Sequence, residues 1–127
     1  MSWDIVIFST VQKLASVEEV DEHFFRPTNF DQVLQRHFPV VSHPDGHREI
    51  YGIDFTIEYD GDDEPGSVTT FHLYGENALY ALIHVAKLEN WQLFDTGIGA
   101  MIDLDHPEKN GYGAFQAYLE HVLKQSR

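Results

Sequence analysis

Hydrophobic residues along the chain recur with the period of a β-strand in some segments and of an α-helix in others. Residues 3–8 form a short apolar run rich in β-branched side chains, which predicts a strand. Residues 55–59 alternate apolar and polar side chains, as in a strand buried on one face. Similar patterns predict further strands at residues 49–51, 68–74, 91–95 and 100–104.

Helical signals lie between these strands. Ser16 and Glu19 have the spacing of a capping box, which predicts a short helix that ends before Pro27. A second helix opens at residues 28–31, and Pro39 ends it. Its apolar stripe consists of Phe30, Val33, Leu34, His37 and Phe38. We predict a third helix at residues 76–89 and a last one from about residue 112 to 124.

The resulting order of elements is β-α-α-β-β-β-α-β-β-α. Short turns join neighbouring strands, so most of the strand pairing should be antiparallel. We therefore predict an α+β fold with two layers, in which helices cover one face of a sheet of five to six strands. The length of 127 residues predicts a single domain over residues 1–127.

The charge of the chain is strongly negative. Eight Lys and Arg stand against 21 Asp and Glu, for a net charge of −13 with neutral histidine. This balance argues against binding nucleic acid or an anionic membrane, because phosphate contacts need clustered cations. An acidic surface keeps a protein in solution and can also steer a basic partner toward it.

Other features of composition exclude further kinds of functional site and bear on the location of the protein. The chain has no cysteine, which removes disulfides, thiolate metal sites and cysteine nucleophiles from consideration. No apolar run approaches the length that spans a bilayer, and the first residues do not read as a secretion signal. We expect a cytoplasmic protein. No phosphate-binding glycine loop is present, and we expect no cofactor.

The triplet Asp95-Thr96-Gly97 follows an apolar run, as the catalytic aspartate does in aspartic proteases. Such a protease also needs a flap and a second supporting segment, and the 30 residues after Gly97 leave no room for them. The alternative is a β-hairpin in which Thr96 and Gly97 turn the chain. We favour the hairpin.

Acidic residues are densest between Asp54 and Glu64, and this stretch contains no cation. Three interpretations compete: a solvated turn, a docking patch for a basic partner, and a calcium site. The spacing of an EF-hand loop is missing, which argues against calcium. If the patch binds a partner, its residues are Asp60, Asp62, Asp63 and Glu64, with Tyr59 and Tyr74 as aromatic contacts.

Two other groups could carry chemistry. His43 and His47, with Asp45 between them, are weak candidates for a metal site, because the intervening Pro and Gly make a loop whose convergence is not assured. Asp95 and Asp103 flank the late hairpin, and in a cleft they could serve acid–base catalysis together with histidines. The simpler alternative is that Asp103 lies where the chain leaves the strand.

Two segments carry a weak resemblance to known proteins. Residues 90–104 and 110–119 are similar to those of small bacterial proteins, some of them of the type of immunity proteins, which neutralise toxins delivered between bacterial cells. The resemblance implies a binding protein without catalytic residues, matches no single defined family, and assigns no role to any position. Together with the charge, it predicts a domain that binds a basic protein. A small-molecule-binding or hydrolase-like enzyme using Asp95, Asp103 and histidines is the alternative, and the oligomeric state is undetermined.

Overall fold

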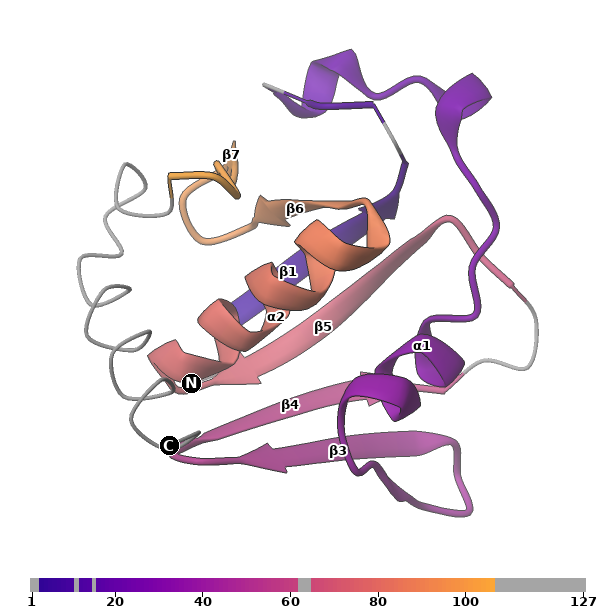
Figure 1. The fold of residues 1–127 in the computed structure, drawn as a ribbon, viewed down its shortest axis with the longest axis vertical. Helices are drawn as coiled ribbons and strands as arrows, with labels where there is room; N and C mark the ends of the chain where they lie inside the picture. The colour runs from indigo at the N-terminus through magenta and orange to yellow at the C-terminus, as the bar shows by residue number, and fades with distance from the viewer. Residues whose placement is uncertain (1–2, 11, 15, 62–64, 107–127) are drawn as a thin grey trace.

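The computed structural model describes residues 3–10, 12–14, 16–61 and 65–106, which build one antiparallel sheet and two α-helices (Figure 1). The strands are β1 (Trp3–Ser9), β2 (Val41–Ser42), β3 (His47–Gly52), β4 (Phe55–Asp60), β5 (Val68–Tyr74), β6 (Trp91–Asp95) and β7 (Ala100–Met101). The helices are α1 (Phe30–His37) and α2 (Glu76–Glu89). The predicted α+β class and antiparallel pairing are confirmed.

The sheet has the strand order β2-β3-β4-β5-β1-β6-β7. It contains seven strands where we predicted five to six, because the short segment β2 pairs with β3 and was not recognised in the sequence. The last predicted helix, from about residue 112 to 124, lies outside the described residues.

Both helices lie on the same face of the sheet, where the main core forms (Figure 1). Leu34 of α1 and Leu82 of α2 are fully buried against inward side chains of the strands, such as Ile5, Ile57 and Phe71. The side chain of Asn29 accepts a hydrogen bond from the Gln32 amide and so caps α1 at its start. Alternation along each strand sends the intervening side chains to the opposite face.

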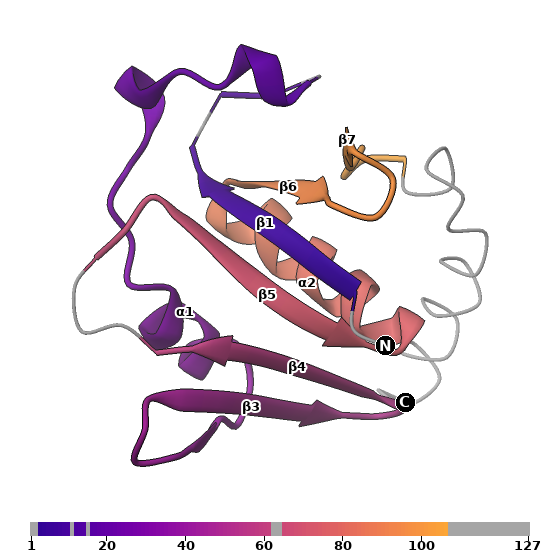
Figure 2. The ribbon, with the colours of Figure 1, turned by 180° about the vertical axis from the view of Figure 1, so that it is seen from behind.

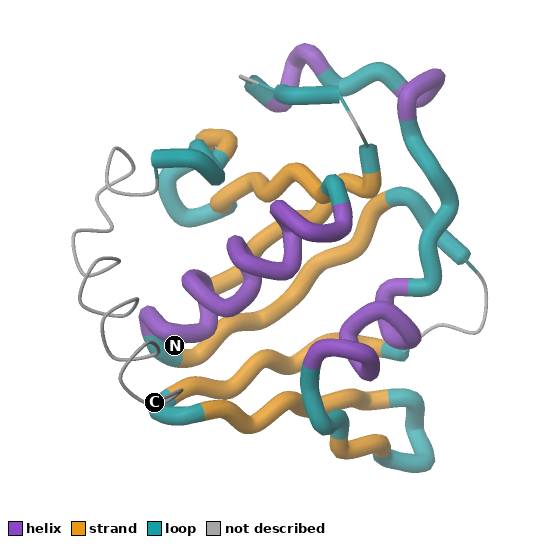
Figure 3. The backbone as a smooth tube through the Cα atoms, in the orientation of Figure 1, coloured by secondary structure: helices purple, strands orange, loops and turns teal. Residues whose placement is uncertain are grey.

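The segment between β1 and α1 differs from the prediction. In place of one helix it holds two short 3-10 turns, Val17–Glu19 and Glu22–Phe24, which appear as separate purple turns in Figure 3. The Asp21 carboxylate accepts the amide of His23, and Phe25 forms a β-bridge with Thr10. These contacts interrupt a helix and hold Phe25 against Phe8.

This connecting segment covers only one end of the second face of the sheet. Leu14 packs there against Phe8 and Met101 in a small second core, joined by half-buried Val6 and Phe94. Figure 2 shows the sheet from this side, with no described segment crossing β3, β4 or β5. We call the part of this face formed by β3, β4, β5 and the start of β1 the open face. Among the described residues, no helix is long and apolar enough to span a membrane.

Candidate functional site

The open face carries a row of titratable side chains that runs across four strands. Glu49 of β3 lies opposite Glu58 of β4, Glu58 lies opposite His72 of β5, and His72 lies opposite Asp4 of β1. His72 Nδ1 and Asp4 Oδ1 are 2.8 Å apart. Side chains opposite one another on one face of a sheet are neighbours, so the row brings together residues from distant parts of the sequence.

The hairpin between β2 and β3 adds two histidines to this row. The amide of His43 donates to the carbonyl of His47 at 2.9 Å, and Gly46 provides the positive φ of +95° that the turn requires. The Asp45 carboxylate accepts the amide of His47 at 2.9 Å, and this bond lowers the pKa of Asp45. The turn places the two imidazole rings on the same side, with centroids 5.6 Å apart.

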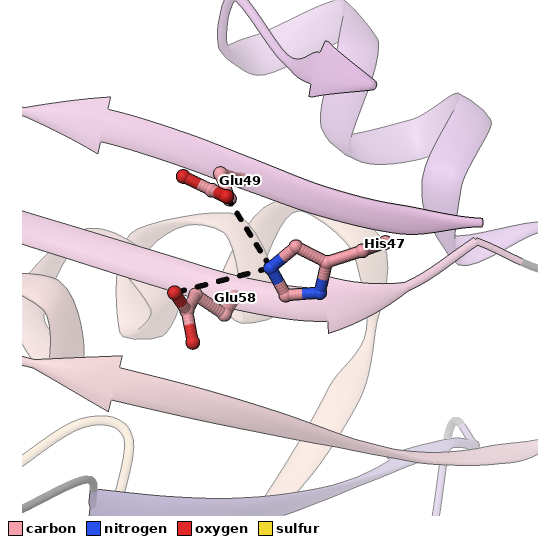
Figure 4. A group of neighbouring side chains, drawn as sticks. All are labelled: His47, Glu49 and Glu58. Atoms are coloured by element: carbon pink, nitrogen blue, oxygen red, sulfur yellow. Dashed lines mark ion pairs between the residues drawn. The ribbon is translucent and has the colours of Figure 1, made fainter. Parts of the chain in front are cut away.

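Both imidazoles direct Nε2 toward one carboxylate oxygen. Glu49 Oε1 lies 2.9 Å from His43 Nε2 and 3.4 Å from His47 Nε2. His47 Nε2 is also 3.9 Å from Glu58 Oε1, so His47 lies between two carboxylates, as Figure 4 shows. We call His43, His47, Glu49 and Glu58 the His–Glu cluster.

Neighbouring residues hold the cluster in place. The hydroxyl of Tyr74 donates to Glu58 Oε2 at 3.0 Å, which leaves Oε1 directed toward His47. The side chain of Glu49 is only 15% exposed, and that of Glu58 is 30% exposed. Interactions between partly buried charges are screened less by salt than those at a fully exposed surface.

The open face is acidic. Asp4, Glu49, Glu58 and Asp60 project from it, while the outward residues of β3, β4 and β5 include no lysine or arginine. Arg48, the one cation within β3, points to the helix-covered face, where its Nε lies 3.5 Å from Asp31 Oδ2. Among the outward residues of these strands, the basic side chains beside the carboxylates are therefore histidines.

The residues predicted as a docking patch separate in the structure. Asp60 is exposed at the end of β4, opposite His47, and Tyr74 lies on the open face. Tyr59 is 2% exposed, and its hydroxyl donates to Asp31 at 2.8 Å, so it is a core residue and is removed from the patch. Asp62, Asp63 and Glu64 lie outside the described residues.

Asp95 is the last residue of β6 and directly precedes a hairpin turn, as we favoured. Its carboxylate accepts the amide of Gly97 at 2.8 Å, its carbonyl accepts the amide of Gly99 at 2.9 Å, and β6 then pairs with β7. Asp95 is 1% exposed. Its hydrogen bonds to Gly97 and Gly99 anchor the turn that connects β6 and β7.

Asp103 occupies a different environment. It lines a cavity of about 440 Å³ together with Lys13, Lys87 and Asp105, and Asp95 does not line this cavity. Asp105 lies 3.4 Å from Lys13 Nζ and 3.7 Å from Lys87 Nζ. The cavity therefore does not contain the Asp95–Asp103 pair on which the enzyme hypothesis was built.

Sequence reasoning singled out His43 and His47 but missed Glu49 and did not connect Glu58 to them. The signal that could have found them is the alternation of side chains along a strand. Positions 43, 47 and 49 share one face of a hairpin, and position 58 lies on that same face in the antiparallel register. A comparison with protein-family models, curated proteins and solved structures finds no match to this chain.

Proposed function

We propose that the chain is a binding protein that recognises a basic protein partner, in the manner of an immunity protein that masks a toxin. Its contact surface is the open face of β3, β4 and β5. The acidic charge of this face, with no lysine or arginine among the outward strand residues, is the single observation that carries the proposal.

Charge complementarity explains why the partner should be basic. The chain as a whole carries −13, so a cationic protein is attracted from a distance. The acidic row across the open face then favours one orientation of encounter, since complementary charges set the register and speed of association. An acidic partner or a nucleic acid would be repelled by the same charges.

Aromatic side chains on the same face would add contact area. Tyr51 and Tyr74 lie in one cross-strand row, with Thr56 between them, and they are 60% and 38% exposed. Ile53, in the turn after β3, is 53% exposed. Tyrosine is enriched among the residues that contribute most to protein interfaces. The resemblance to immunity-type proteins also implies a binding protein, and a cytoplasmic location stays a prediction.

A pair of matched variants tests the proposal. The face variant Y51S/D60K removes one exposed apolar side chain and reverses one charge on the open face, and neither residue belongs to the His–Glu cluster. The control L88S/E18K makes the same changes at exposed positions away from the open face, in α2 and in the first 3-10 turn. Each protein is immobilised and exposed to lysate of the native cell at low and at high salt.

We expect the unmodified chain and the control variant to retain the same basic protein at low salt, and the face variant to lose it. High salt should release that protein, because exposed charge contacts are screened. Equal capture by the face variant and by the control, or capture that salt does not affect, would show that this face is not the electrostatic contact surface.

A further inference from the structure

We infer that the His–Glu cluster is a binding site for a divalent transition metal of the zinc type. His47, Glu49 and Glu58 provide the three ligand atoms, which lie close together. His43 lies beside Glu49, with its Nε2 2.9 Å from Glu49 Oε1, and is not counted as a ligand. This inference goes beyond the proposed partner binding, because it concerns a ligand that the isolated chain would bind.

The spacing of the potential ligand atoms is that of a metal site. Single side-chain atoms of His47, Glu49 and Glu58 all lie within 4.8 Å of one another. Ligands about 2.0–2.1 Å from a tetrahedral zinc ion are separated by about 3.3 Å. The separations of 3.4 Å and 3.9 Å from His47 Nε2 to the two carboxylates lie close to this value, so small side-chain rotations would complete the coordination.

The register of the sheet gives a second, independent reason. Glu49 and Glu58 lie directly opposite each other in neighbouring strands, and like charges in such a pair destabilise a sheet. A cation between or beside the two carboxylates would relieve this repulsion. His47 Nε2 lies beside both carboxylates, and a divalent ion bound there would neutralise them.

The surroundings also resemble those of a metal site. Tyr74 holds Glu58 by its second oxygen, at 3.0 Å, and Asp45 fixes the backbone of His47 at 2.9 Å. Partners of this kind orient the ligands before the metal arrives and strengthen binding. The ligands themselves come from β3 and β4, and strands position side chains more rigidly than a loop does.

The donor set determines the class of metal. Imidazole nitrogens with carboxylate oxygens suit zinc and its neighbours among the first-row transition metals. Calcium takes six to eight oxygen ligands, and magnesium keeps most of its waters, so neither matches a small site in which one ligand is an imidazole nitrogen. Ion pairs between imidazolium and carboxylate are the competing explanation for these contacts, and they need no metal.

Calorimetric titration of the untagged full chain with zinc chloride distinguishes these explanations. We expect one zinc ion to bind per chain, and zinc at a hundredfold excess over Kd to raise Tm by roughly 5–10 °C. H47Q and E49Q should each weaken zinc binding by more than roughly tenfold, since they remove a ligand rather than a supporting contact. Circular dichroism checks that both variants are folded.

H72Q is the matched control, because His72 lies on the same face and is paired with a carboxylate but is not in the cluster. It should bind zinc like the unmodified chain. Absence of zinc binding, unchanged binding by both H47Q and E49Q, or an equal response to calcium would each overturn the inference. Zinc binding is measured on the isolated chain and partner capture is measured in lysate, so a failure of the partner proposal and a failure of the metal site remain distinguishable.

Discussion

Alternation along β4 decides which face of the sheet the side chain of Tyr59 lies on. Residues 55, 57 and 59 share the helix-covered face of β4, whereas 56, 58 and 60 share the open face. The Tyr59 hydroxyl reaches Asp31 at the start of α1, and Arg48 lies beside the same carboxylate. The alternation was visible in the sequence, and strict use of it would have assigned Tyr59 to the core.

The Tyr59–Asp31 contact predicts a particular dependence of stability on pH. Burial, followed by the hydrogen bond to Asp31, raises the pKa of Tyr59 above its usual value of 10.0. The unfolded chain therefore loses this proton at a lower pH than the folded chain. The contribution to stability is complete below pH 10 and is lost as the pH rises beyond it.

Y59F should lower the free energy of unfolding by about 1.5 kcal/mol at pH 7, because a hydrogen bond to a charged group is lost. The difference between Y59F and the unmodified chain should shrink above pH 10. Urea unfolding at pH 7, 9, 10 and 11 measures both quantities. A difference that stays constant over this range would contradict the raised pKa of Tyr59.

At the scale of elements, periodicity predicted the regular parts of the fold and failed where tertiary contacts decide. The helix at residues 76–89 and the strands at 68–74 and 91–95 have the bounds that the sequence indicated. The capping box at Ser16 and Glu19 is followed by the 3-10 turn Val17–Glu19 and not by an α-helix. Its segment must instead pack Leu14 and Phe25 onto the sheet, and this tertiary requirement overrides a local helical preference.

Gly75 lies at the boundary between β5 and α2, where the backbone conformation and a close contact both require glycine. It joins β5 to α2 with a φ of +91°, and a Cβ there would lie 2.6 Å from the carbonyl oxygen of Asp54. G75A should therefore lower the free energy of unfolding by about 2 kcal/mol or more, because both the backbone and the neighbouring turn resist the new side chain.

G66A is the matched control. A Cβ at Gly66 would meet only the Val68 carbonyl oxygen, at 4.0 Å, and the free energy of unfolding should change by less than about 0.5 kcal/mol. Thermal and urea unfolding of both variants provide the comparison. Equal destabilisation by G66A and G75A would show that the close approach to Asp54 does not matter.

At the scale of the whole molecule, the sequence revealed the charge but not its distribution. A net charge of −13 is read from composition, whereas the set of acidic residues that share the open face depends on the strand order and on the register between β3, β4 and β5. The His–Glu cluster also depends on that register. Glu49 and Glu58 are nine positions apart in the chain and become neighbours only when β3 pairs with β4.

The absence of cysteine allows the most direct test of whether the open face contacts a partner. A single cysteine introduced as T70C lies on this face, next to His72, at an exposed and uncharged position. L88C places the same group on the exposed side of α2, which is the matched control. Each variant carries a thiol-linked photo-crosslinker and is irradiated in native lysate.

We predict that the crosslinker at position 70 forms a discrete adduct with one basic protein, identified by mass spectrometry, and that the crosslinker at position 88 does not. The same adduct formed from position 88 and not from position 70 would contradict the claim that the open face is the binding surface.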